Sequence, residues 1–294
     1  MHRFLRAIGF SKIKTREEFN NLIKKALDNP VASYYNLYKD DVVYGDKYFK
    51  VGNNMGLVVC GDIDSKDEFV WEYAFPCFEP STISTNSRSS VDRQASRVAF
   101  SGICEDNKIG VTIIYYLINR IDYMKESLSG KESLNGVSVS FSALSDKGTI
   151  MMPLAKDILA KQKGGKKIKN RDKLIEAARQ GDEKAIESLT IDDIDVYSTL
   201  SRRIKEDDLY TIVDTYFMPY GVECDLYSVM GEIEEINEVK NSVTDEMVYQ
   251  MAISCNGMHI DVCINKEDLF GEPAVGRRFK GTIWLQGQLN YPLK

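Results

Sequence analysis

The residues best suited to chemistry lie in a hydroxyl-rich segment, residues 79–96, and just beyond it. Arg88, Arg93 and Arg97 accompany eight serines and threonines there. Guanidinium groups, hydroxyls and free backbone N–H groups together can hold a phosphate or a carboxylate. Long irregular segments inside a domain are commonly either functional or mobile. The sequence therefore predicts an anion-binding site at these three arginines, with a mobile polar loop as the alternative.

A second group of residues resembles a catalytic triad but lacks what a triad needs. Ser254, His259 and Asp261 fall on one face of a predicted hairpin, with His259 beside both others. A working nucleophile lies on a sharp turn, with oxyanion donors beside it and a buried carboxylate behind the histidine. A serine in the middle of a strand does not meet these conditions. We interpret the three residues as one polar strand face, so any catalytic residues stay unassigned.

The sequence predicts no metal site and no cofactor. Gly164–Lys167 resembles the end of a phosphate-binding loop but lacks that loop's leading glycine and its final serine or threonine. Asp62–Asp67 begins like a calcium loop, yet the glycine and the glutamate of such a loop are missing. The chain has two histidines, His2 and His259, which are too few for a histidine-rich zinc site.

Length and composition describe a folded, mildly acidic protein of about two domains. The chain has 294 residues, 38 of them basic and 44 acidic, and 43% are hydrophobic. Its longest apolar stretch, Ile109–Ile118, is far shorter than the roughly 20 residues of a spanning helix. The first ten residues lack a signal cleavage site, and the six cysteines show no C-x-x-C spacing. We expect no membrane association, reduced thiols and a cytoplasmic location.

Charge is unevenly distributed along the chain. Residues 1–150 carry 19 groups of each sign, whereas residues 201–294 carry 9 basic and 16 acidic residues. An acidic segment repels phosphate backbones, so nucleic-acid binding is disfavoured there. Between these parts, eight basic residues from Lys156 to Lys173 face two aspartates. We expect residues 154–205 to form a basic helical connector.

Residues 1–153 predict an α+β domain. The capping box Thr15–Glu18 begins an amphipathic helix. Alternating patterns after this helix predict an antiparallel sheet, with a tight turn at Tyr44–Lys47. A hairpin over Val137–Met152 is expected to turn at residues 146–148.

Residues 206–294 predict an acidic, β-rich domain. Asn256-Gly257 is a strong two-residue hairpin signal. A turn there pairs Cys255 with Met258, which places apolar side chains on one face of the hairpin and polar ones on the other. The strands around it and a short helical turn follow the order of an OB-like small barrel, although little chain remains after Gln286 for a fifth strand. An antiparallel sheet is the alternative.

Several stretches resemble an uncharacterised bacterial family from clostridia, a domain of unknown function about as long as this chain. They are residues 1–10, Leu174–Asp182, Phe217–Asp225 and Trp284–Gly287. The resemblance covers essentially the full length. It implies a bacterial, cytosolic protein and implies no activity, cofactor or ligand.

These observations favour a non-catalytic cytosolic binding or assembly protein, because the sequence contains no complete triad, metal cluster, phosphate loop or redox pair. A protein partner or a second copy of the chain stays open. One alternative is an enzyme of unrecognised class that holds an anionic small molecule in a cleft between the domains. The other is a nucleic-acid-binding protein that uses the basic connector.

Overall fold

The computed structural model describes residues 2–38, 42–95, 98–106, 108–128, 134, 136–153, 177, 182–184, 187 and 213–292. The chain divides into two compact units, one formed by Met1–Met151 with Thr215–Lys294 and the other by Met152–Asp214. Apart from the short pieces just given, the predicted connector lies outside the described residues. The first unit carries all the elements that follow.

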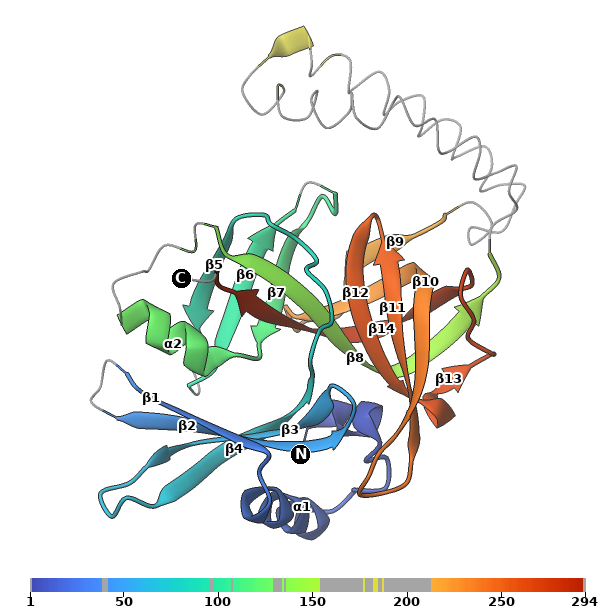
Figure 1. The fold of residues 1–294 in the computed structure, drawn as a ribbon. Coiled ribbons are helices and arrows are strands. Elements are labelled where there is room, and N and C mark those ends of the chain that lie inside the picture. The colour runs from blue at the N-terminus through green and yellow to red at the C-terminus, as the bar shows by residue number, and fades with distance from the viewer. Residues whose placement is uncertain are drawn as a thin grey trace. The chain divides into compact units, whose positions relative to one another are not determined.

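A four-stranded antiparallel sheet forms one layer of this unit (Figure 1). Helix α1 packs on its outer face and buries Leu22, Ile23 and Ala26. The predicted capping box is confirmed, since the Thr15 side chain and Glu18 exchange hydrogen bonds with each other's backbone N–H. The elements are α1 (Arg16–Asp28), β1 (Ala32–Leu37), β2 (Val43–Gly52), β3 (Met55–Ile63) and β4 (Phe69–Phe78).

Five strands close into a barrel. Its ladder runs β8–β12–β11–β10–β14 and returns to β8, and the β8–β12 pair is parallel while the other pairs are antiparallel. The sequence after Gln286 is too short for a fifth barrel strand, and β8, from earlier in the chain, supplies that strand instead. The five strands are β8 (Ser138–Met151), β10 (Leu226–Lys240), β11 (Met247–Cys255), β12 (Met258–Asn265) and β14 (Arg278–Asn290).

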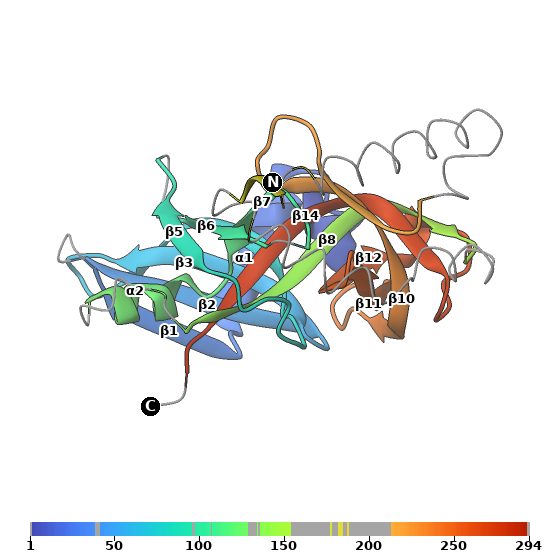
Figure 2. The same cartoon turned by 90° about the horizontal axis from the view of Figure 1, so that it is seen from above.

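Strands β8 and β14 run on beyond the barrel. They pair from Met151↔Arg278 to Ser138↔Asn290, and at Gln286 and Gly287 β14 also pairs with β7. Strands β6 and β5 continue this sheet, which lies over the four-stranded sheet (Figure 2). The predicted domains 1–153 and 206–294 therefore share one sheet. The remaining elements are η1 (Arg3–Ile8), β5 (Ser89–Arg93), β6 (Phe100–Glu105), β7 (Thr112–Leu117), α2 (Arg120–Leu128), β9 (Tyr216–Pro219), η2 (Lys266–Asp268) and β13 (Leu269–Phe270).

The hairpin at Asn256-Gly257 has the predicted register, from Cys255↔Met258 to Tyr249↔Ile264. Both turn residues have positive φ, as this type of turn requires. The expectation that its second face is a polar surface is wrong, because Gln250 and Asp261 are buried there. The Gln250 amide donates to the backbone of Asn53, and other early segments of the chain cover the same face.

Two predicted turns are wrong because their glycines admit aromatic rings instead of reversing the chain. Gly45 lies within β2, where a Cβ would meet the Tyr35 ring at 2.6 Å. Gly148 lies within β8, where a Cβ would meet the Phe279 ring at 2.4 Å. The expected hairpin over 137–152 is consequently one long strand.

Among the described residues, no helix is long and apolar enough to cross a membrane.

Candidate functional site

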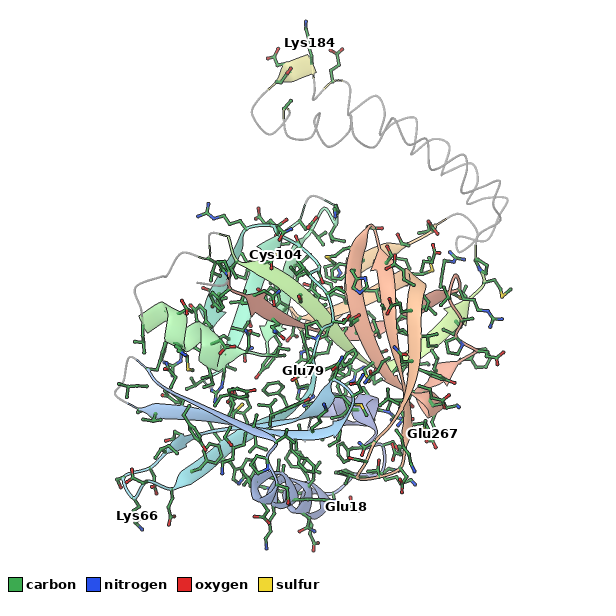
Figure 3. All side chains as sticks on the ribbon, viewed as in Figure 1. Glu18, Lys66, Glu79, Cys104, Lys184 and Glu267 are labelled. Atoms are coloured by element: carbon green, nitrogen blue, oxygen red, sulfur yellow. The ribbon has the colours of Figure 1, made fainter. Side chains whose placement is uncertain are left out.

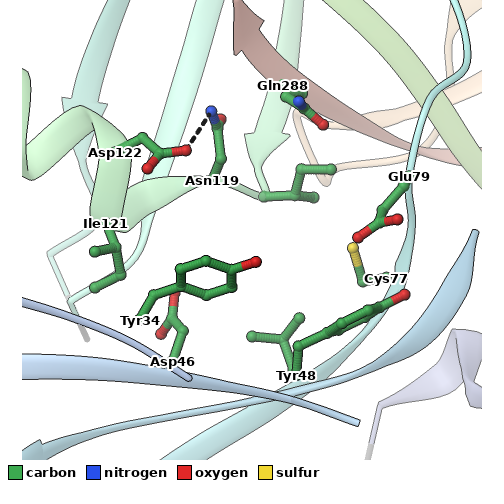
Figure 4. Close-up of a pocket in the computed structure, with 11 residues that line it drawn as sticks. Tyr34, Asp46, Tyr48, Cys77, Glu79, Asn119, Ile121, Asp122 and Gln288 are labelled. Atoms are coloured by element: carbon green, nitrogen blue, oxygen red, sulfur yellow. Dashed lines mark hydrogen bonds between the residues drawn. The ribbon is translucent and has the colours of Figure 1, made fainter. Parts of the chain in front are cut away.

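A cleft with a cavity of about 170 Å³ lies between the inner face of the four-stranded sheet and the chain that joins β7 to α2 (Figure 4). Strands β1, β2, β3 and β4 supply one wall, and the first turn of α2 with β14 supplies the other. The polar side chains used in the argument below belong to Tyr34, Asp46, Tyr48, Glu79, Asn119, Asp122 and Gln288.

Tyr48 is the most informative residue of the cleft. Its side chain is 8% exposed, and its hydroxyl has no hydrogen-bond partner in the described part of the chain. Burial raises the pKa of this hydroxyl, and the nearby Cys77 and Glu79 raise it further. A buried hydroxyl without a partner costs about 1–3 kcal/mol. Such a group calls for a water molecule or a ligand next to it.

Glu79 comes immediately after the end of β4 (Figure 3) and lies near the Tyr48 hydroxyl (Figure 4). It is partly buried, and no described residue donates a hydrogen bond to its carboxylate. Burial raises the pKa of Glu79, while the exposed Lys50 opposes that shift. The carboxylate is therefore available to a ligand in the cleft.

Asn119 and Asp122 form the opposite side of the cleft (Figure 4). The Asn119 amide donates to the Leu289 carbonyl at 2.9 Å and to the Asp122 carboxylate at 3.3 Å. The Leu289 N–H in turn donates to the Asn119 side-chain oxygen at 3.1 Å. These bonds fix the first turn of α2 to β14, so Asp122 stands on a well-anchored element.

A buried ion pair forms the floor. Asp46 is 4% exposed and Arg120 1%, and the Arg120 Nε and Nη2 atoms lie 2.8 and 2.7 Å from Asp46 Oδ1. The guanidinium also donates to the carbonyls of Gly45 and Val98. Because every charge is matched within the pair, it adds no net charge to the cleft. It ties α2 to β2 and so holds the two walls together.

Apart from Asp46, which Arg120 neutralises, the charged side chains that line the cavity are those of Glu79 and Asp122. No lysine or arginine is among the residues described as lining the cavity, so the lining is negatively charged. The Cys77 thiol is no nucleophile, since burial raises its pKa well above the usual value. Within the described residues, no group of three histidine, cysteine or carboxylate side chains could hold a metal ion. The cleft suits a ligand that donates hydrogen bonds.

The predicted anion site lies elsewhere. Arg88 precedes β5 and Arg93 ends it, both are exposed, and neither lines the cleft. Five residue steps along an extended strand place their Cα atoms roughly 16 Å apart. Arg97 lies outside the described residues. Hydroxyls of the same segment close the loop instead, because Thr85 and Ser87 donate to Asp106. The anion site therefore stays a prediction.

His259 lies between two carboxylates rather than beside a nucleophile. Its Nε2 is 3.2 Å from Asp261 and its Nδ1 is 3.2 Å from Glu234. The hydrogen bond to Asp261 raises the pKa of His259 most, against burial, and Glu234 adds to it. Asp261 also accepts from the Oγ of Ser81 at 2.8 Å and from its backbone N–H. No hydrogen bond joins the Ser254 and His259 side chains in the described structure.

Sequence patterns did not identify the residues of the cleft. Asp46 lay in a supposed turn, and Tyr48, Glu79 and Asp122 belong to no motif. One usable signal existed, because Asp46 and Tyr48 are two positions apart on one strand, which places both side chains on the same face of the sheet.

The molecule is thus a mostly β protein with a closed five-stranded barrel and a polar cleft between two sheets. Residues 5–287 match the family described as a domain of unknown function from E. rectale (DUF3881), and the chain belongs to that family. No curated protein and no solved structure is significantly similar to this chain.

Proposed function

We propose that this chain is a non-catalytic binding protein that holds one small organic molecule in the cleft. The buried Tyr48 hydroxyl, which lacks a partner among the described residues, carries the proposal. An engineered cavity of about 150 Å³ accommodates benzene, so a cavity of about 170 Å³ suits roughly six to ten non-hydrogen atoms. The cytoplasm remains the location we propose.

The lining favours binding over catalysis. Cys77 is the one thiol of the described lining, and burial, with the nearby Glu79, raises its pKa well above the usual value. The alternative of an enzyme for an anionic substrate is less favoured, since Glu79 and Asp122 would repel such a molecule. The alternative of nucleic-acid binding depends on the connector, which lies largely outside the described residues.

The substitution Tyr48→Phe tests the proposal. A library of fragments of six to ten non-hydrogen atoms is screened by NMR against the side-chain amides of Asn119 and Gln288, which line the cleft. We expect hits whose affinity falls about three- to tenfold in Tyr48→Phe, since a neutral hydrogen bond contributes about 0.5–1.5 kcal/mol. The free energy of unfolding should stay unchanged or rise, because the substitution removes an unpaired hydroxyl.

Tyr35→Phe is the matched control, because Tyr35 is a half-exposed tyrosine of β1 that does not line the cleft. Its affinity for the hits should equal that of the unmodified protein. The proposal fails if no fragment shifts the two amide resonances, or if Tyr48→Phe binds the hits as tightly as the control.

We also propose that the barrel is of the OB type with a permuted strand order. Strands β10, β11 and β12 form the antiparallel meander, the short helix η2 follows, and the next barrel strand in the chain, β14, pairs with β10. Strand β8 takes the place of the last strand, since it pairs in parallel with β12 and antiparallel with β14. Barrels of this type serve many functions, so the topology adds nothing to the choice of ligand.

A further inference from the structure

We infer that the ligand of the cleft is a small organic cation that carries an ammonium or guanidinium group. This inference rests on the proposed binding function and adds the chemical class of the ligand. Two independent features lead to it, namely the charges of the lining and the orphaned hydroxyl with its aromatic surroundings.

The charges come first. Glu79 and Asp122 line opposite sides of the cavity (Figure 4), and the third acid of the lining, Asp46, is neutralised by Arg120. Lys50 is the cation that lowers the pKa of Glu79, but Lys50 is exposed and does not line the cavity. Glu79 is partly buried whereas Asp122 is exposed, so a cation is attracted most strongly by Glu79, and an anion is repelled by both carboxylates.

The uncharged groups fit the same class of ligand. The Tyr48 hydroxyl and the Gln288 amide carry oxygens that can accept hydrogen bonds from an ammonium or guanidinium group. The rings of Tyr34 and Tyr48 also line the cavity, and the faces of aromatic rings attract organic cations. A ligand with two or three N–H donors would therefore use what the walls offer.

Three probes of matched size test the inference on the full-length protein. They are n-butylammonium, n-butanol and n-butyrate, which differ at one end in charge and hydrogen bonding. Binding is followed by NMR through the side-chain amides of Asn119 and Gln288. We expect n-butylammonium to bind at least tenfold more tightly than n-butanol, and n-butyrate to show no binding.

Charge-neutralising variants identify the groups that select the cation. Glu79→Gln should weaken the binding of n-butylammonium at least fivefold, and Asp122→Asn should weaken it less because Asp122 is exposed. Both variants should leave the binding of n-butanol unchanged. Glu72→Gln is the matched control, because it removes the same charge from an exposed position of β4 outside the cleft. Its affinities should equal those of the unmodified protein, with circular dichroism showing that every variant is folded.

The outcomes separate the two proposals. Equal or tighter binding of n-butanol or n-butyrate overturns the cation inference and leaves small-molecule binding intact. The same holds if all three probes fail while neutral fragments bind in the cleft. If neither the probes nor any fragment shifts the two amide resonances, both proposals are wrong. If Glu72→Gln weakens n-butylammonium as much as Glu79→Gln does, the overall charge of the protein and not the cleft selects the ligand.

Discussion

The two faces of the long β8–β14 ladder differ in what they bury. Toward the barrel interior the ladder presents apolar side chains such as Ala143, Ile283 and Leu285, each fully buried. Toward the four-stranded sheet it presents, beside the apolar Leu144 and Trp284, the side chains of Ser142 and Gln286, which are fully buried but polar. Both polar side chains bond to the backbone of β4, where Gln286 bridges Phe78 and Pro76.

This difference shows where the molecule can accept a ligand. An apolar interior gains stability from close packing and contains no side-chain groups that need hydrogen-bond partners. An interface that also buries polar groups must satisfy each of them, and Ser142 and Gln286 are satisfied by the backbone of Pro76 and Phe78 in β4. Three buried hydroxyls lack a described partner, those of Tyr48, Tyr115 and Tyr291, and of these only Tyr48 lines the cavity of the cleft. The coincidence of an unpartnered hydroxyl with a cavity therefore places the candidate site between the two sheets.

The largest expected effect comes from breaking the polar interface at its ion pair. Arg120→Met should lower the free energy of unfolding by about 4 kcal/mol, because it leaves the buried Asp46 carboxylate uncompensated. Urea denaturation measures this loss. The double variant Asp46→Leu/Arg120→Met should recover a substantial part of it, because no buried charge is left alone. A double variant no more stable than Arg120→Met would show that packing, not charge, explains the effect.

Truncation inside the barrel should be somewhat milder and should leave the cleft unaffected. Ile253 is fully buried in the barrel and pairs with Ile233 and Ile260 on neighbouring strands. Ile253→Ala should cost about 3 kcal/mol in unfolding free energy through lost apolar burial and a cavity. Affinity for cleft ligands should not change, as measured by NMR titration below the unfolding transition. A loss of affinity would contradict the separation of the two regions.

The barrel half was the more predictable half because its signals are local. The Asn256-Gly257 turn fixes the register of β11 with β12, and side-chain alternation then fixes their buried face. The closing strand β8 was not predictable in this way. It comes from before the connector, and Gly148 within it resembles a turn residue although it makes room for Phe279.

The cleft half depends on contacts between distant segments, so its sequence carries few local signals. Asp46 and Arg120 are 74 residues apart, and neither belongs to a motif that announces a partner. Gly45 resembles a turn residue for the same reason as Gly148, since it lies opposite an aromatic ring. Burial of the second hairpin face was missed because the segments that cover it are far away in sequence.

The smallest expected effect concerns the contact between the barrel and the segment that follows Glu79. His259 bonds to Glu234 of β10 and Asp261 of β12, and Asp261 also holds Ser81, two residues after Glu79. Because the folded-state pKa of His259 is raised, its contribution to stability is fully present below the unfolded pKa of about 6.5 and is lost as pH rises through the folded value.

His259→Gln should therefore destabilise the protein more at pH 6 than at pH 9, by less than about 1 kcal/mol because the histidine is partly solvated. Denaturant unfolding at both pH values measures the difference. If the gap between His259→Gln and the unmodified protein is independent of pH, the ring acts through packing and not through charge. In that case the affinity of the cleft should not follow the protonation of His259.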